Sequence, residues 1–233
     1  MELWRIDRAV KGLCQDVESF IQVVDHKQMT EVDLAYELVI CILGSGVKYE
    51  TCVSYAHEMR RRNFLSKKFI LSGNSKDTLE EVLVSPVENI TEDYSCKKYR
   101  HPKKGAGNVF KSLYQVFIEY GCFKSLIKSS CNFSELRREI IRICPGIGPK
   151  QASHFLKNIG YTDNVAILDR HIIKYLELSK GINITGYSVS RIEKYEEIES
   201  QFIRLAGSFG FSASIVDQSL WFVMRSLNGR AFV

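Results

Sequence analysis

The sequence lacks the residue patterns of metal and disulfide sites. The sequence has seven cysteines, an odd number, and no two of them form a C-x-x-C pair. This usage is typical of thiols in a reducing compartment rather than of a disulfide framework. No cysteine follows Cys144, which excludes an iron–sulfur cluster near the C-terminus. The five histidines form no H-E-x-x-H motif, so we expect no metal site.

Long apolar runs are absent as well. No run reaches the roughly 18 apolar residues that a membrane-spanning helix needs, so we expect no contact with a membrane. The first residues, MELWRIDRAVKG, mix acidic and basic groups and lack the continuous apolar region of a signal peptide. We expect a soluble intracellular protein, cytoplasmic and associated with the nucleoid, or nuclear if the source is a eukaryote.

The chain does contain enough apolar material for a core. Of its 233 residues, 45% are hydrophobic, which suffices for one large domain or two small ones that share an interface. The 32 Lys and Arg residues exceed the 27 Asp and Glu residues, which gives a formal net charge of +5. This mild excess permits an acidic partner such as nucleic acid but does not require one.

Helical periodicity dominates the chain, and alternating runs typical of strands are few and short. Asp77 and Ser134 stand where the N-caps of two helices are expected. We therefore expect an all-α fold. The predicted helices cover residues 32–43, 51–63, 77–84, 107–121, 133–144, 149–159, 169–179, 190–207 and 212–227.

The string CPGIGPK, residues 144–150, predicts a tight hairpin between two helices. Its glycines cannot continue the first helix, whereas Pro149 fits the first turn of the second. Because Gly146 and Gly148 have no side chain, a DNA strand could approach the backbone closely. Amides at a helix N-terminus form a phosphate site that the helix dipole strengthens. We predict that Gly146, Ile147 and Gly148 bind the DNA backbone.

One lysine and one aspartate follow the hairpin. The helix at 149–159 buries one apolar face, so Lys150, His154 and Lys157 share the opposite face. Asp169 stands nineteen residues after Lys150 and is a good N-cap for the run RHIIKYL. Taken alone, Lys150 could contact a phosphate and Asp169 could merely cap a helix.

Longer strings carry a resemblance to a known family. GPKQASHFLKNIGY, with AILDRHI after it, resembles the type-2 8-oxoguanine DNA glycosylases of the helix-hairpin-helix, Gly/Pro…Asp superfamily. YRHP at 99–102 and DQSLWFVMRSLNGRAFV at 217–233 resemble two further strings of that family. The resemblance covers most of residues 30–233 and is strongest at 144–172.

The resemblance implies a fold and a mechanism. We expect two helical subdomains, one of residues 30–143 and one of residues 1–29 with 144–233. The hairpin would lie at their junction and the active site in the cleft between them. In the lysine-bearing branch, the residue matched by Lys150 attacks the sugar C1′, expels the base and forms a Schiff base that permits β-elimination. Asp169 would stabilise the positive charge that develops on the sugar.

The resemblance also implies a pocket that encloses an extruded base. Trp221 stands where the family places a base-stacking aromatic residue. We expect His154 and the C-terminal Val233 to line the pocket with it. The chain departs from the family in its last residues, GRAFV, and in the Gly-Ser-Gly string at 44–46. Relatives have Asn or Gln there to fill the gap left by the base, and here that role would pass to Ser45, Lys48 or Tyr49.

We expect a bifunctional DNA glycosylase and AP lyase that removes 8-oxoguanine from double-stranded DNA as a monomer. No cofactor is expected to be required, with room for a monovalent cation at the hairpin backbone. Two alternatives stay open. An endonuclease III-like glycosylase would act on oxidised pyrimidines, but the missing cluster cysteines and the SHFLKN string argue against it. A non-catalytic helix-hairpin-helix module would bind DNA and would need no acid at a fixed distance from the lysine.

Overall fold

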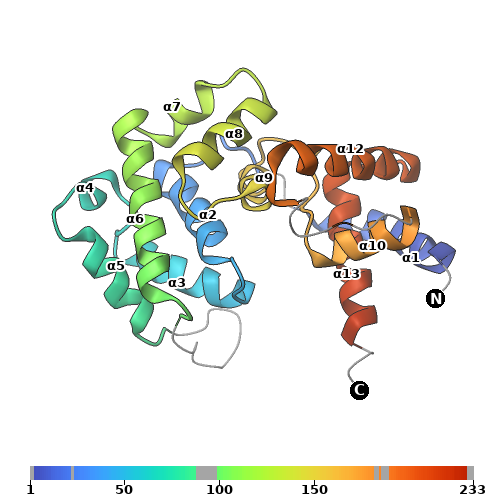
Figure 1. Ribbon diagram of the computed structural model, residues 1–233, viewed down its shortest axis with the longest axis horizontal. Helices are drawn as coiled ribbons and strands as arrows, with labels where there is room; N and C mark the ends of the chain where they lie inside the picture. The colour runs from blue at the N-terminus through green and yellow to red at the C-terminus, as the bar shows by residue number, and fades with distance from the viewer. Residues whose placement is uncertain (1–2, 22–23, 88–98, 181–183, 185–188, 230–233) are drawn as a thin grey trace. The chain divides into compact units, whose positions relative to one another are not determined.

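The computed structural model describes residues 3–21, 24–87, 99–180, 184 and 189–229 (Figure 1). Helices form the fold within these ranges, and no strand occurs in them, which confirms the all-α prediction. The chain divides into two compact units. Unit 1 combines Met1–Val24 with Gly148–Val233, and unit 2 is Asp25–Ile147. The divisions expected from the sequence are at 29/30 and 143/144, and those in the structure are at 24/25 and 147/148.

Unit 2 is built around a buried helix. α2 is apolar on most of its surface. It is buried because α3, α6 and α7 pack around it. α5 in turn packs along α6. The helices of unit 2 are α2 (Glu31–Leu43), α3 (Tyr49–Arg61), α4 (Lys67–Ile70), α5 (Ser75–Val84), α6 (Pro102–Glu119), α7 (Phe123–Lys128) and α8 (Phe133–Ile143).

Two of the predicted helix caps in unit 2 are wrong. Asn132, not Ser134, caps α8: its side chain accepts the backbone amide of Glu135 at 3.0 Å, and its backbone is extended, as an N-cap requires. α5 begins at Ser75, so Asp77 lies within the first turn of that helix instead of before it. Asp77 still suits this position, because a negative charge near a helix N-terminus is favourable.

Tyr99 is a buried structural residue of unit 2. Its hydroxyl donates to the carbonyl oxygen of Leu43 at 2.8 Å, and its amide donates to the hydroxyl of Tyr55 at 3.1 Å. Gly105 leaves room for the Tyr99 ring, since a methyl group there would lie 2.8 Å from the ring atom Cε1. Because Leu43 ends α2, Tyr99 fixes the point from which the 44–46 loop leaves that helix.

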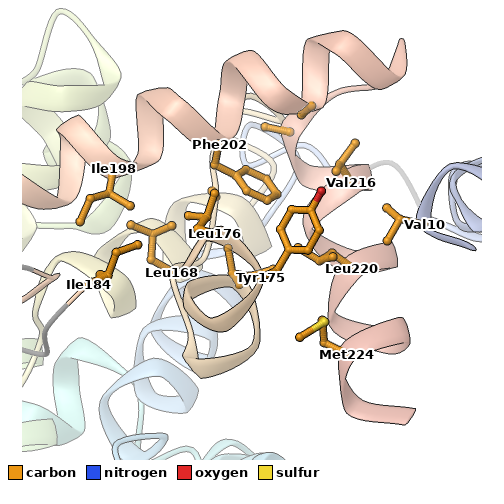
Figure 2. Close-up of a cluster of buried hydrophobic side chains, with 14 of the residues drawn as sticks. Val10, Leu168, Tyr175, Leu176, Ile184, Ile198, Phe202, Val216, Leu220 and Met224 are labelled. Carbon is orange, nitrogen blue, oxygen red and sulfur yellow. The ribbon is translucent and has the colours of Figure 1, made fainter. Parts of the chain in front are cut away.

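Unit 1 joins both ends of the chain in one core. Figure 2 shows this core, in which Val10 of α1, Tyr175 of α10, Phe202 of α12 and Leu220 of α13 lie together. The helices of unit 1 are α1 (Leu3–Phe20), α9 (Pro149–Asn158), α10 (Arg170–Lys180), α12 (Ile192–Phe209) and α13 (Ala213–Gly229).

α1 is not among the helices predicted from the sequence, because all of those begin after residue 30. Its buried side chains are Ile6, Val10, Cys14 and Val17, which recur at intervals of three or four residues. They form a single apolar stripe, and α1 packs against α13 along it.

None of the helices in the described ranges is both long enough and apolar enough to cross a membrane.

Candidate active site

The first half of the hairpin requires a glycine. α8 ends at Ile143, and Gly146 then adopts a φ of +87°, a left-handed conformation that side chains disfavour. A methyl group at Gly146 would also overlap with the side-chain amide of Asn108 on α6. One turn along α6, the hydroxyl of Ser112 donates to the carbonyl oxygen of Pro145 at 3.4 Å. This half of the hairpin is therefore held closely against α6.

The second half of the hairpin starts α9. Gly148 is the N-cap, with extended backbone, and Pro149 occupies the first helical position as the sequence predicts. Lys150 follows at the second position. The first N–H groups of a helix have no acceptor within the helix, so the positive end of the helix dipole lies at Lys150. Such an end favours anions, including the phosphate groups of DNA.

The three predicted phosphate-binding positions differ in what they offer. Gly146 is exposed. The side chain of Ile147 is buried, and its amide donates to the carbonyl oxygen of Cys144 at 3.1 Å. The amide of Gly148 donates to the side-chain oxygen of Gln151 at 3.3 Å. A DNA phosphate would therefore share the last two amides with acceptors of the chain, and contact between these positions and DNA stays a prediction.

One face of α9 carries three basic residues. Lys150, His154 and Lys157 lie at i, i+4 and i+7 and are each partly buried, whereas Phe155 and Leu156 are fully buried in the core. Burial, with the nearby charges of Lys157 and Lys150, lowers the pKa of His154 to about 4. His154 is therefore a neutral imidazole at pH 7, and it can donate or accept a hydrogen bond beside Lys150.

Asp169 caps α10 as predicted. Its Oδ1 atom accepts the backbone amides of His171 at 2.8 Å and Ile172 at 3.0 Å. Its carbonyl oxygen accepts the amide of Ile173 at 2.9 Å, which is the first bond of the helix. The carboxylate is partly buried, and two hydrogen bonds to one oxygen fix its rotation. Asp169 belongs to the same unit as Lys150.

Asp217 is a buried carboxylate to which the sequence analysis assigns no role. Its Oδ1 accepts the amide of Ile167 at 3.0 Å, and its Oδ2 forms an ion pair with the ammonium of Lys157 at 3.1 Å. Burial raises the pKa of Asp217, while Lys157 and the Ile167 amide act against that rise. The signal in the sequence is an acidic residue inside the apolar run of α13, because a buried carboxylate requires partners.

Trp221 lies on α13 with neighbours at its edge and on its face. The rings of Trp221 and His171 meet in a T-shaped arrangement, with centroids 6.2 Å apart. The guanidinium carbon of Arg225 lies 4.7 Å from the Trp221 centroid, which is a cation–π contact. Trp221 is partly buried, so the residue keeps some exposure to solvent.

The predicted site residues come from both units. Gly146 and Ile147 belong to unit 2. Val233 lies outside the described residues. Unit 1 holds the others, which are Gly148, Lys150, His154, Asp169 and Trp221.

The 44–46 loop of unit 2 is exposed. Gly46 has a φ of +72°, and no atom lies within 4 Å of where its Cβ would be. The three side chains proposed as fillers of the gap in the DNA stack are all exposed; they are Ser45, Lys48 and Tyr49. None of the three is buried in a structural role that would prevent contact with DNA.

Groups of three or more His, Cys, Asp or Glu side chains that could hold a metal ion do not occur within the described ranges.

Comparison with known proteins identifies relatives along most of the chain. The family model described as 8-oxoguanine DNA glycosylase matches residues 14–211. The 8-oxoguanine DNA glycosylase/AP lyase of Saccharolobus solfataricus is 36% identical over 187 residues, which are 80% of this chain and 79% of that protein. The protein of the same name from Metallosphaera sedula is 31% identical over 142 residues, or 61% of this chain. That match spans 66% of the Metallosphaera protein, just under two thirds.

Solved structures agree with the sequence relatives. The crystal structure of the Methanocaldococcus jannaschii 8-oxoguanine DNA glycosylase has a TM-score of 0.73 and 26% identity, covering 94% of this chain and 93% of that chain. A second structure of this enzyme, in complex with a 15mer DNA containing 8-oxoguanine, has a TM-score of 0.65 and 27% identity, covering 94% and 88%. Since the family model spans well over half of the sequence, the chain belongs to the 8-oxoguanine DNA glycosylase family.

Proposed function

We propose that this protein removes 8-oxoguanine from double-stranded DNA through a Schiff base on Lys150 and then cleaves the strand by β-elimination. One observation carries the proposal. Lys150 stands in the first turn of α9, directly after a hairpin whose glycine is required, and Asp169 in the same unit is held rigidly as a helix cap. The relatives named as 8-oxoguanine DNA glycosylase/AP lyase support the substrate.

The first stage breaks the bond between base and sugar. The lone pair of neutral Lys150 Nζ forms a bond to C1′, and the electron pair of the C1′–N9 bond leaves with the base. The base gains a proton, and the new ammonium at Nζ loses one. Positive charge develops on the sugar ring during this step, and the carboxylate of Asp169 stabilises it. The step requires the neutral form of Lys150, because only that form has a free electron pair at Nζ.

The second stage cleaves the strand. Opening of the sugar ring at O4′ gives an imine between C1′ and Nζ, which is protonated. A base then removes a proton from C2′, and the electron pair expels the 3′ phosphate from C3′. Water hydrolyses the unsaturated imine and releases Lys150 unchanged. The neutral imidazole of His154, one turn along α9, is a candidate to accept or relay a proton.

Recognition of the lesion involves residues of α13 and the chain end. Trp221 offers an aromatic face to the extruded base, with its ring oriented by His171 and Arg225. Val233 is proposed to contact the base. Gly146, Ile147 and Gly148 are proposed to hold the DNA backbone, with a monovalent cation at the hairpin carbonyls. The protein is proposed to act as a monomer and to need no cofactor.

Reduction with borohydride tests the proposal. Sodium borohydride converts an imine between protein and DNA into a stable amine, so wild type with an 8-oxoguanine duplex should give a trapped adduct. Lys150→Gln should give none. Lys11→Gln, which removes an exposed lysine of α1, is the matched control and should trap as wild type does. An adduct formed by Lys150→Gln would place the nucleophile at another residue.

The same assay separates the alternatives when the lesion is varied. Matched duplexes would carry 8-oxoguanine, thymine glycol or unmodified guanine. Faster release of thymine glycol than of 8-oxoguanine would favour the activity on oxidised pyrimidines. Binding to all three duplexes without excision or trapping would identify a DNA-binding module with no glycosylase activity.

A further inference from the structure

The segment that leads to Asp169 is buried without being part of a helix. Residues 165–168 are each at most 8% exposed. A buried backbone outside regular structure still needs hydrogen-bond partners, because an unpaired N–H or C=O group is costly. Neighbouring strands would normally supply them, but no strand occurs in the part of the chain that the structure describes.

Side chains supply these partners instead. Tyr195 of α12 donates its hydroxyl to the carbonyl oxygen of Ala166 at 2.8 Å and accepts the amide of Leu168 at 3.2 Å. Glu199, one turn along α12, accepts the amide of Ala166 at 3.3 Å. Asp217 of α13 accepts the amide of Ile167 at 3.0 Å. The segment is thus fixed from two helices, and its next residue is Asp169.

Asp217 differs from the other two because it also holds α9. While Oδ1 accepts the Ile167 amide, Oδ2 pairs with Lys157, whose side chain is only 17% exposed. Lys157 lies two turns after Lys150 on the same face of α9. One buried carboxylate therefore connects the helix of Lys150 with the segment that ends at Asp169.

We propose that Asp217 is a positioning residue for base excision, which fixes Asp169 relative to Lys150 by binding the Ile167 amide and Lys157 at once. The inference rests on the proposed function of Lys150 and Asp169. Asp217 takes no part in the chemistry itself. Its effect arises because a displacement of about 1 Å between reacting groups can lower a rate roughly a hundredfold.

Asparagine and alanine at position 217 separate the two bonds. Asp217→Asn keeps an acceptor for the Ile167 amide and loses the charge that pairs with Lys157, whereas Asp217→Ala loses both. The single-turnover rate of 8-oxoguanine excision should fall about tenfold in Asp217→Asn and about a hundredfold in Asp217→Ala, with the Kd for the lesion duplex within about threefold of wild type. Lys157→Met removes the same ion pair from the α9 side and should also lower the excision rate about tenfold.

Val10→Ala controls for a simple loss of stability. Val10 is fully buried in the same core, and its apolar side chain forms none of the hydrogen bonds that hold residues 165–168, so this variant opens a cavity and leaves those bonds in place. It should excise at nearly the wild-type rate below its Tm. The inference is overturned if Asp217→Ala and Asp217→Asn excise as fast as Val10→Ala, or if their loss appears in the Kd instead of the rate.

Amide hydrogen exchange provides a readout that needs no activity. The amides of His171 and Ile172 donate to Asp169, whereas the amide that donates to Asp217 is that of Ile167. They should exchange at least about tenfold faster in Asp217→Asn than in Val10→Ala if Asp217 holds Asp169 in place. Equal exchange would overturn the inference. Wild type that neither excises nor traps DNA would instead refute the proposed function, and the exchange result would still decide the role of Asp217. Should Asp217→Ala fail to fold, Asp217→Asn and Lys157→Met carry both measurements.

Discussion

The Oδ1 atom of Asp169 accepts the backbone amide of Ile172 at 3.0 Å, so the carboxylate proposed for catalysis is also the N-cap of α10. The two roles support each other. A cap fixes the side chain in one rotamer, and a fixed negative charge stabilises a developing positive charge without reorganisation. Because asparagine caps helices about as well as aspartate, the two roles can be separated by one substitution.

Asp169→Asn should therefore lower the chemical rate and leave the fold intact. We expect single-turnover excision to fall about a hundredfold or more, since loss of a preorganised electrostatic contact costs rates of this order. The free energy of unfolding should change by less than about 0.5 kcal/mol, whereas Asp169→Ala, which removes the cap, should lose about 1 kcal/mol. Denaturant titration and quenched kinetics measure the two effects. A near-wild-type rate in Asp169→Asn would leave Asp169 as a cap alone.

Gly146→Ala should destabilise the hairpin and weaken DNA binding without regard to the lesion. Its φ of +87° and the overlap with Asn108 predict a loss of about 1–3 kcal/mol in the free energy of unfolding. Affinity for damaged and undamaged duplex should fall by the same factor, because backbone contacts carry no base information. Asn108→Ala combined with Gly146→Ala should recover part of the stability. A loss of affinity confined to the lesion duplex would contradict the proposed role.

Trp221→Ala should weaken lesion processing by about 1–3 kcal/mol, the usual contribution of stacking between a base and an aromatic ring. Trp221→Phe keeps an aromatic face and should recover most of the loss. The measurement is kcat/KM for excision of 8-oxoguanine. Alanine and phenylalanine variants of equal activity would mean that Trp221 serves only the packing of α13.

The lowered pKa of His154 predicts a dependence of stability on pH. Protonation is disfavoured in the folded state, where the pKa is about 4, relative to the ordinary value of 6.5. The contribution of His154 is therefore fully present above pH 6.5 and is lost as pH falls toward 4. Between pH 7 and pH 5, wild type should lose about 1–2 kcal/mol more than His154→Gln in the free energy of unfolding. Parallel pH profiles for the two proteins would show that His154 protonates freely when folded.

The elements around the hairpin could be predicted because their signals are local. Pro149 at the start of α9 and the cap at Asp169 each depend on a few neighbouring residues, and both are confirmed. Helix caps predicted from residue type alone were less accurate. Ser134 and Asn132 are both good N-cap residues, and only the extended backbone at Asn132 decides between them.

The residues that escaped prediction act through contacts distant in sequence. Tyr99 begins the string YRHP, and only the structure shows that it is buried and hydrogen-bonded to Leu43 and Tyr55. The acidic residue inside the apolar run of α13 indicates that Asp217 needs partners, but only the structure identifies them as Lys157 and Ile167, fifty or more residues away. α1 has a single apolar stripe, and the helix gains its stability from packing this stripe against α13.

Because the two segments of unit 1 lie on either side of unit 2 in the sequence, unit 1 cannot complete its fold until unit 2 has been synthesised. Unit 2 is one continuous stretch, Asp25–Ile147, and all of its packing partners have been translated once Ile147 leaves the ribosome. α1 is synthesised before unit 2, whereas its partner α13 is synthesised after it. At a synthesis rate of about 5–20 residues per second, the apolar stripe of α1 stays exposed on the order of 10–40 s before α13 is complete. During that interval α1 is the part of the nascent chain that a chaperone would be expected to bind.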